Sequence, residues 1–176
     1  MKQILYIFVI LLLYSCSSTK LATDKELSDL NSTLDKGYFI FEANSANPVA
    51  FANVRGIENL LPPGSNTASI NLVNNPNYLR VRNDSLYISL PYFGEQQLSI
   101  GYNSSNSGIQ FEGIPKKTTS KFNKKKQKQE LVFDVRTEGE SLKMVLTLFP
   151  NRSAKLDVNS SHRTSIFYYG KWKPLE

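Results

Sequence analysis

The chain has 176 residues, of which 40% are hydrophobic and 20% charged, and it carries a formal net charge of +6 with one cysteine and one histidine. Its length predicts one domain, and its composition excludes disordered, collagen-like and coiled-coil chains. One cysteine excludes an internal disulfide framework and multi-cysteine metal sites. One histidine excludes His-rich metal centres, and it is the only side chain that would ordinarily titrate near neutral pH as a general acid or base. We therefore expect no metal and no cofactor.

The first fifteen residues have the pattern of a bacterial signal peptide. Lys2 supplies a positive start, and residues 4–14 form an unbroken apolar run that is about half the length of a membrane-spanning helix. The run ends in Leu13-Tyr14-Ser15-Cys16, which resembles the lipoprotein signal in which the cysteine is lipidated. The alternative is a plain secretory signal with an incidental cysteine, and we favour Cys16 as the lipidation site.

Lipidation of Cys16 would anchor the protein stably, because three acyl chains exceed the two membrane-binding signals that stable anchoring needs. We therefore expect a signal peptide over 1–15, a polar tether over 16–23 and a single β-rich domain over 24–176 in the bacterial cell envelope. The tether lacks the acidic cluster that marks surface export in the Bacteroides group. This favours an outer-membrane anchor facing the periplasm, with exposure at the cell surface as the alternative.

Residues 23–36 have the pattern of an α-helix. Thr23 and Glu26 have the spacing of a capping box, in which each side chain satisfies a free backbone amide of the first turn. Gly37 is placed to end the helix. The apolar residues in between recur at helical spacing: Leu27, Leu30 and Leu34. We expect this leucine stripe to pack on the domain as a lid, in preference to binding a partner.

From Tyr38 onward the hydrophobic period changes to two, which predicts strands separated by Asn-, Asp-, Gly- and Pro-rich turns. Short strands at about ten-residue spacing predict a mainly β fold, an antiparallel meander that forms a barrel or a sandwich. Only one helix is expected, which argues against nucleotide-binding α/β folds. The predicted strands are 38–41, 50–54, 68–72, 78–81, 86–90, 98–102, 108–111, 131–135, 142–149, 154–158 and 166–169.

The basic excess has one source, a predicted hairpin that holds seven lysines and no acid. Removing these seven from the 21 basic residues leaves 14 against 15 acidic residues, so the rest of the chain is nearly neutral. The hairpin could contact an anionic surface, or its lysines could protect an exposed edge strand, which we favour. Nucleic acid is disfavoured, because Phe122 alone offers stacking. The lysines are Lys116, Lys117, Lys121, Lys124, Lys125, Lys126 and Lys128.

Catalytic patterns are weak. His162 lies in a polar turn near several serines, and a Ser–His–acid arrangement is recognised by geometry, but the chain has no Gly-x-Ser-x-Gly motif to support one. An exposed turn histidine is therefore the favoured interpretation. Glycoside hydrolysis needs a pair of carboxylates, and the spacing of the acidic residues singles out no such pair. The candidates are Asp84, Glu95, Glu112, Glu130, Asp134 and Asp157.

Four segments of the chain carry a family resemblance: 39–43, 75–94, 108–113 and 159–170. Together they resemble an uncharacterised lipoprotein family of the Bacteroides group, domain of unknown function 4251. The resemblance covers about residues 24–170, and Leu90-Pro91-Tyr92-Phe93-Gly94 is its most specific part. It implies a small secreted or lipid-anchored β-rich domain without an assigned biochemical role, and it supplies no catalytic residues.

Two turns beside the predicted strand 86–90 carry candidate sites. Asp84-Ser85-Leu86 resembles the Asp-Ser/Thr-aliphatic signal for O-glycosylation of exported proteins in the Bacteroides group, which makes Ser85 a candidate acceptor. On the other side, Tyr92 and Phe93 follow Pro91. Their rings either plug the mouth of a barrel, which we favour, or face a lipid or glycan.

These observations favour a non-catalytic envelope lipoprotein that binds a hydrophobic or anionic envelope component, either a lipid or a glycan. It would use an aromatic-lined cavity and the lysine hairpin. A structural or assembly subunit that docks on another envelope protein is the alternative, and an envelope hydrolase comes third. The expected partners are the membrane, through the lipid anchor, and an envelope lipid, glycan or protein, but no nucleic acid.

Overall fold

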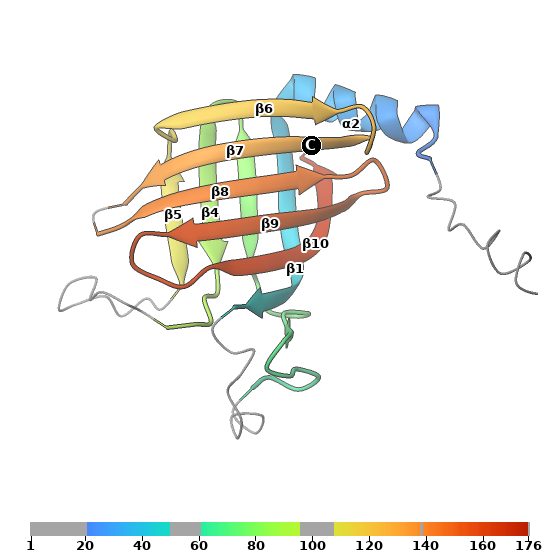
Figure 1. Ribbon diagram of the computed structural model, residues 1–176. Coiled ribbons are helices and arrows are strands. Elements are labelled where there is room, and N and C mark those ends of the chain that lie inside the picture. Colours follow the sequence, from blue (N-terminus) through green and yellow to red (C-terminus); the bar gives the residue numbers. More distant parts are fainter. Residues whose placement is uncertain (1–20, 50–60, 96–107, 138, 176) are drawn as a thin grey trace, which may run out of the picture.

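The computed structural model describes residues 21–49, 61–95, 108–137 and 139–175, which form one curled antiparallel sheet and a helix (Figure 1). The order of strands across the sheet is β5-β4-β3-β1-β10-β9-β8-β7-β6, and the short β2 pairs with β1. The elements are α2 (Asp24–Lys36), β1 (Tyr38–Pro48), β2 (Ile70–Asn71), β3 (Tyr78–Arg82), β4 (Ser85–Leu90), β5 (Ile109–Gly113), β6 (Lys117–Asn123), β7 (Lys128–Arg136), β8 (Ser141–Leu148), β9 (Ser153–Ser160) and β10 (Ile166–Pro174).

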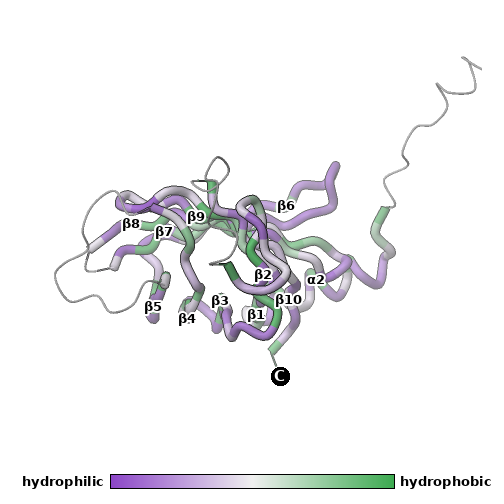
Figure 2. The backbone as a smooth tube through the Cα atoms, turned by 90° about the horizontal axis from the view of Figure 1, so that it is seen from below, coloured by the Kyte–Doolittle hydropathy of each residue, from purple (hydrophilic) through white to green (hydrophobic). Residues whose placement is uncertain are grey.

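The sheet curls because its two edge strands follow each other in the chain. Strands β5 and β6 lie at opposite ends of the strand order, yet only residues 114–116 connect them. So short a segment spans no more than about 14 Å, which draws the two edges of the sheet together at this point. The result is a half-barrel, with β3–β5 and β1 along one side and β6–β9 along the other (Figure 2). The predicted mainly β fold with one helix is confirmed.

Strand β1 joins the two halves and departs from the expected simple meander. It pairs with β3 through residues 38–41 and with β10 along almost its whole length, with an irregularity between Ala43 and Ser45. At this irregularity the buried Asn77 takes the place of a neighbouring strand. Its side chain accepts a hydrogen bond from the Ala43 amide at 2.8 Å and donates to the Ala43 carbonyl at 2.9 Å. Thus β1 extends beyond the predicted strand 38–41.

Large aromatic side chains fill the space between the two sides of the half-barrel. Phe39, Phe41, Tyr168 and Trp172 are all almost fully buried and belong to one continuous core. The polar atoms of the two largest are satisfied, because the Trp172 Nε1 donates to a backbone carbonyl at 2.7 Å and the Tyr168 hydroxyl to another at 2.8 Å. Burial raises the pKa of the Tyr168 hydroxyl, which therefore stays neutral.

Helix α2 lies across one opening of the half-barrel (Figure 1). Both bonds of the predicted capping box are present between Thr23 and Glu26, and Gly37 ends the helix in the left-handed conformation. Leu30 is fully buried and Leu34 packs against the core. The predicted helix and its packing on the domain are confirmed.

Several predicted segments lie outside the described residues. They are the signal peptide over 1–15, Cys16 and most of the tether, and the strands 50–54 and 98–102. Among the residues that are described, no helix is long and apolar enough to cross a membrane.

Candidate anion-binding groove

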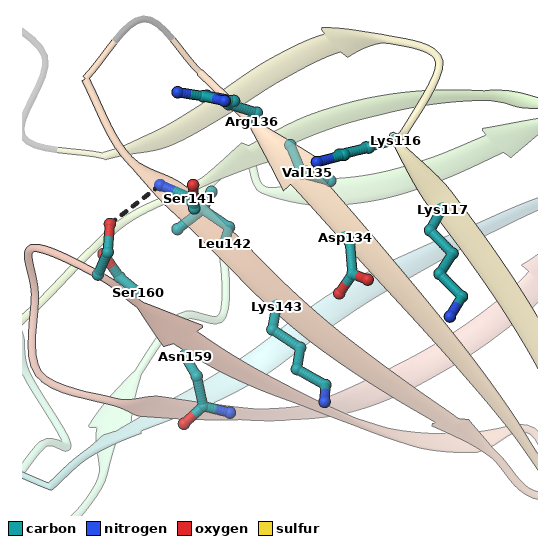
Figure 3. A pocket seen from close by; sticks show the side chains of 11 residues that line it. Lys116, Lys117, Asp134, Val135, Arg136, Ser141, Leu142, Lys143, Asn159 and Ser160 are labelled. Atoms are coloured by element: carbon teal, nitrogen blue, oxygen red, sulfur yellow. Dashed lines mark hydrogen bonds between the residues drawn. The ribbon is translucent and has the colours of Figure 1, made fainter.

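A groove of about 610 Å³ lies on the outer face of the half-barrel, where the chain passes from β5 to β6 (Figure 3). Strands β6–β9 and the turns beside them form its walls. The lining residues are Lys116, Lys117, Asp134, Val135, Arg136, Ser141, Leu142, Lys143, Asn159, Ser160 and Ser161.

Strand register brings the polar groups of the groove into one row. Lys117 pairs with Asp134, Asp134 with Lys143, and Lys143 with Asn159, each on the next strand. Residues directly opposite each other on neighbouring strands share a face of the sheet, and Figure 3 shows the Asp134 carboxylate between the two lysines. Since the alternate residues of β7 and β8 are buried in the core, this row faces solvent.

The groove carries an excess of positive charge. Four cationic side chains, from Lys116, Lys117, Arg136 and Lys143, line the groove together with the single carboxylate of Asp134. The ion pairs found among the described residues involve none of these four cations, and all four side chains belong to exposed residues. Such a cluster can attract an anion and bond it without first breaking an internal salt bridge.

A buried ion pair holds the turns at one end of the groove. Arg163 lies 3.1 Å from a Glu140 carboxylate oxygen, and the two side chains are only 6% and 4% exposed. The other carboxylate oxygen accepts from the Ser160 hydroxyl at 2.5 Å, and a second guanidinium nitrogen donates to the Gly108 carbonyl at 3.1 Å. The pair therefore ties together the starts of β8 and β5 and the β9–β10 turn. No pattern in the sequence indicates this pair, because acids and arginines are common in turns.

Serine hydroxyls and backbone bonds form the rim of the groove next to this pair. Ser141 and Ser161 exchange two hydrogen bonds of 3.0 Å, one between backbone atoms and one from the Ser141 amide to the Ser161 hydroxyl. The same hydroxyl lies 2.7 Å from the Nδ1 of His162. In the part of the chain that the structure describes, no carboxylate is bonded to this imidazole. The arrangement gives hydrogen-bonding groups at the rim without an assembled Ser–His–acid triad.

The structure separates the seven lysines instead of gathering them. Lys116 and Lys117 lie in the groove, at the beginning of β6. Lys121 and Lys128 lie further along the hairpin, and the Lys128 ammonium pairs with Glu130 at 2.6 Å. The remaining three, residues 124–126, occupy the exposed turn between β6 and β7. The hairpin thus presents two basic regions, one at each end of β6.

The positive charge of the hairpin should be measurable as a lowered pKa of the Glu130 carboxyl. The hydrogen bond from Lys128, with added attraction from Lys121 and Lys126, holds the Glu130 pKa below its usual value of 4.5. The folded protein therefore gains stability from Glu130 above pH 4.5 and loses it as the pH falls through the lowered pKa. We expect K128M to raise the Glu130 pKa toward 4.5 in an NMR titration of the side-chain carboxyl carbon.

The matched control is K155M, which removes a lysine that pairs with Asp157 on the same face and should leave the Glu130 titration unchanged. A wild-type Glu130 that titrates at 4.5 would contradict the lowered pKa. The stability effect of K128M should stay below about 1 kcal/mol, because the pair is partly exposed.

The other candidate residues lie apart from the groove. The Tyr92 hydroxyl donates to the Thr164 carbonyl at 2.9 Å and its ring, like that of Phe93, packs against the core; burial raises the Tyr92 pKa. Ser85 is the first residue of β4 and is partly exposed next to Asp84. The lipidation candidate Cys16 lies outside the described residues.

The described residues contain no group of three histidine, cysteine or acidic side chains that could hold a metal ion. The six carboxylates considered for glycoside hydrolysis are spread over the fold, and Glu112, for example, lies on β5 while Asp157 lies on β9. The groove brings together three of the candidate residues, Lys116, Lys117 and Asp134.

Comparisons with known proteins identify relatives but no activity. A family model described as domain of unknown function (DUF4251) matches residues 22–172. A search of curated proteins finds no match. A crystal structure of a DUF4251 family protein from Bacteroides eggerthii superposes with a TM-score of 0.57 at 16% sequence identity, and covers 85% of this chain and 88% of that one. At this identity the likeness shows the fold alone.

Proposed function

The chain belongs to the DUF4251 family of domains of unknown function, and from its groove we propose that it is a non-catalytic, lipid-anchored envelope protein that binds an anionic envelope component. The observation that carries this proposal is the set of four cationic side chains, free of ion pairs with described residues, around the groove. One end of the groove is held in place, because the buried pair of Glu140 and Arg163 joins the neighbouring turns.

The chemistry of the lining indicates what the ligand carries. Lysines act as point charges for phosphate or carboxylate, and the Arg136 guanidinium can bond such a group with two parallel hydrogen bonds. The Asp134 carboxylate and the hydroxyls of Ser141 and Ser161 suit ligand hydroxyl groups. The groove therefore fits an anion that also carries hydroxyls, such as a glycerophosphate headgroup or an acidic glycan.

The envelope location rests on Cys16, and intact-mass measurement on protein purified from its native host tests it. Lipidation predicts a chain that begins at Cys16 and carries three acyl chains, held at the outer membrane and facing the periplasm. A chain cleaved elsewhere, or an unmodified Cys16, would contradict the anchor. Mass analysis of a proteolytic digest of the same protein tests O-glycosylation at Ser85, since an unmodified Ser85 peptide would contradict that assignment.

Titration with defined anions tests the groove. We expect thermal stabilisation of the wild type by short-chain phosphatidylglycerol or by oligogalacturonate, and weaker binding at high salt, because salt screens exposed charges. The double variant K117E/K143E should bind at least about tenfold more weakly, which corresponds to about 1.4 kcal/mol. The two probes distinguish a phosphate headgroup from a carboxylate glycan.

The matched control is K36E/K171E, which changes the net charge equally at two exposed lysines outside the groove. Its affinity should stay close to that of the wild type. Equal losses in the two double variants would show attraction by net charge alone, and no stabilisation by either probe would contradict the proposed groove.

A further inference from the structure

The chain enters the domain directly beside the tip of the lysine hairpin. The Ala22 backbone amide donates a 2.8 Å hydrogen bond to the Gln127 side chain, although the two residues are far apart in sequence. A hollow of about 470 Å³ next to this bond is lined by both segments, among them Leu21 and Lys126. The N-terminal segment and the hairpin tip therefore form one surface.

The hairpin tip, residues 122–127, combines exposed cations with exposed apolar groups. Lys124, Lys125 and Lys126 are all exposed, and the Phe122 ring is 39% exposed. Leu21 of the neighbouring N-terminal segment is 71% exposed. Basic residues beside exposed apolar side chains are typical of surfaces that lie on anionic membranes, where the cations meet headgroup phosphates and the apolar groups enter the interface.

A hydrogen bond shapes the tip, and its three lysines form no ion pair with the described residues. The Asn123 side chain accepts from the Lys126 amide at 3.0 Å, and Gln127 adopts the left-handed conformation at φ 45°. Ion pairs among the described residues involve none of the three tip lysines. The nearby Glu26 carboxylate bonds the Thr23 amide and hydroxyl in the helix cap.

The length of the tether sets how far this surface can be from an anchored Cys16. Five residue steps separate Cys16 from Leu21, and a fully extended chain of that length spans at most about 18 Å. If the thiol is lipidated, Leu21 stays within that distance of the anchored residue, and the tip lies beside Leu21 through the Ala22–Gln127 hydrogen bond. A short tether and a basic tip on the same side of the domain then act as two membrane-binding signals.

We propose that the hairpin tip, with Lys124, Lys125, Lys126 and Phe122, docks on anionic phospholipid headgroups beside the lipid anchor and orients the half-barrel on the membrane. The docking role rests on the proposed anchor at Cys16. Docking of the tip would place the groove up to about 20 Å from the bilayer. The groove lies at the other end of β6, and the six residue steps from Lys117 to Asn123 rise about 3.3 Å each. An oriented domain would thus hold its groove toward the periplasm.

Amine labelling tests the orientation on the full lipidated chain, purified from its host and reconstituted into vesicles. One vesicle population contains phosphatidylcholine alone, and the other also contains phosphatidylglycerol. Each lysine next to an anionic leaflet strengthens binding about fivefold, so acetylation of Lys124, Lys125 and Lys126 should fall about tenfold or more in the anionic vesicles. Labelling of Lys36 and Lys171, which are exposed and lie outside both the tip and the groove, should be the same in both populations.

A charge variant distinguishes docking of the lysines on the headgroups from proximity that the lipid anchor alone would cause. In K124Q/K125Q/K126Q, amide hydrogen exchange over residues 122–127 should lose its protection by anionic vesicles, whereas the matched variant K36Q/K171Q/K173Q should keep it. Equal labelling of the wild-type tip lysines in both vesicle populations, with Cys16 lipidated, would overturn the docking role.

Failure of the anchor gives a different result. If intact mass shows an unmodified Cys16, the lipoprotein assignment fails, and co-sedimentation with anionic vesicles then decides the docking role by itself. Binding that the K124Q/K125Q/K126Q variant loses would support docking, and no binding would overturn it.

Discussion

The variant R163M is expected to lower the free energy of unfolding by about 3–5 kcal/mol, because it leaves the Glu140 carboxylate buried without its cation. Methionine keeps much of the side-chain volume, so lost packing contributes little. The change also removes the hydrogen bond to the Gly108 carbonyl and so loosens the start of β5. Urea denaturation followed by tryptophan fluorescence measures the effect, since Trp172 is buried in the core.

The double variant R163M/E140Q provides the control. A neutral amide removes the unpaired charge while it can still accept from Ser160, so this chain should be more stable than R163M alone. Two single variants and the double variant close a double-mutant cycle, which should give a coupling of at least about 1 kcal/mol. Additive effects would show that the pair does not hold these turns together.

G170A is the other substitution with a large expected effect. A Cβ at Gly170 would lie 2.0 Å from the Glu42 carbonyl oxygen and 2.7 Å from the Ala43 Cα, which are backbone atoms of the partner strand β1 and cannot rotate away. The strands must therefore separate in the centre of the sheet, where β1 joins its two halves. We expect a loss of about 3 kcal/mol in unfolding free energy, the upper end of the usual cost of overpacking.

The neighbouring K171A serves as the control for G170A. Lys171 is exposed on the same strand, and its truncation should change stability by no more than about 0.5 kcal/mol. A G170A protein as stable as the wild type would contradict the close approach of β1 and β10.

The sequence predicted those elements whose signals are local. The helix cap at Thr23 and Glu26 and the alternation in β4 and β7 depend on neighbours in the chain, and the structure has both. The second half of β1 was missed, because Asn44, Ser45 and Asn47 interrupt its apolar pattern. Their environment depends on strands far away in sequence, which no local pattern contains.

The groove could be predicted only in part. Its lysines were visible as a charge cluster, but their separation into two regions follows from the extended length of β6. The row from Lys117 to Asn159 exists because four strands pair in one particular register, and a shift of one residue would turn those side chains to the other face. The buried partner of Glu140 likewise depends on how two distant turns meet.

Two-dimensional NMR of the isotope-labelled protein, titrated with short-chain phosphatidylglycerol and with oligogalacturonate, tests the central claim most directly. An anion-binding groove predicts saturable shifts of the amides of Lys117, Ser141, Lys143 and Ser161 with at least one probe, and their absence in K117E/K143E. Shifts confined to the turn at Tyr92 and Phe93, or no saturable shifts with either probe, would contradict it.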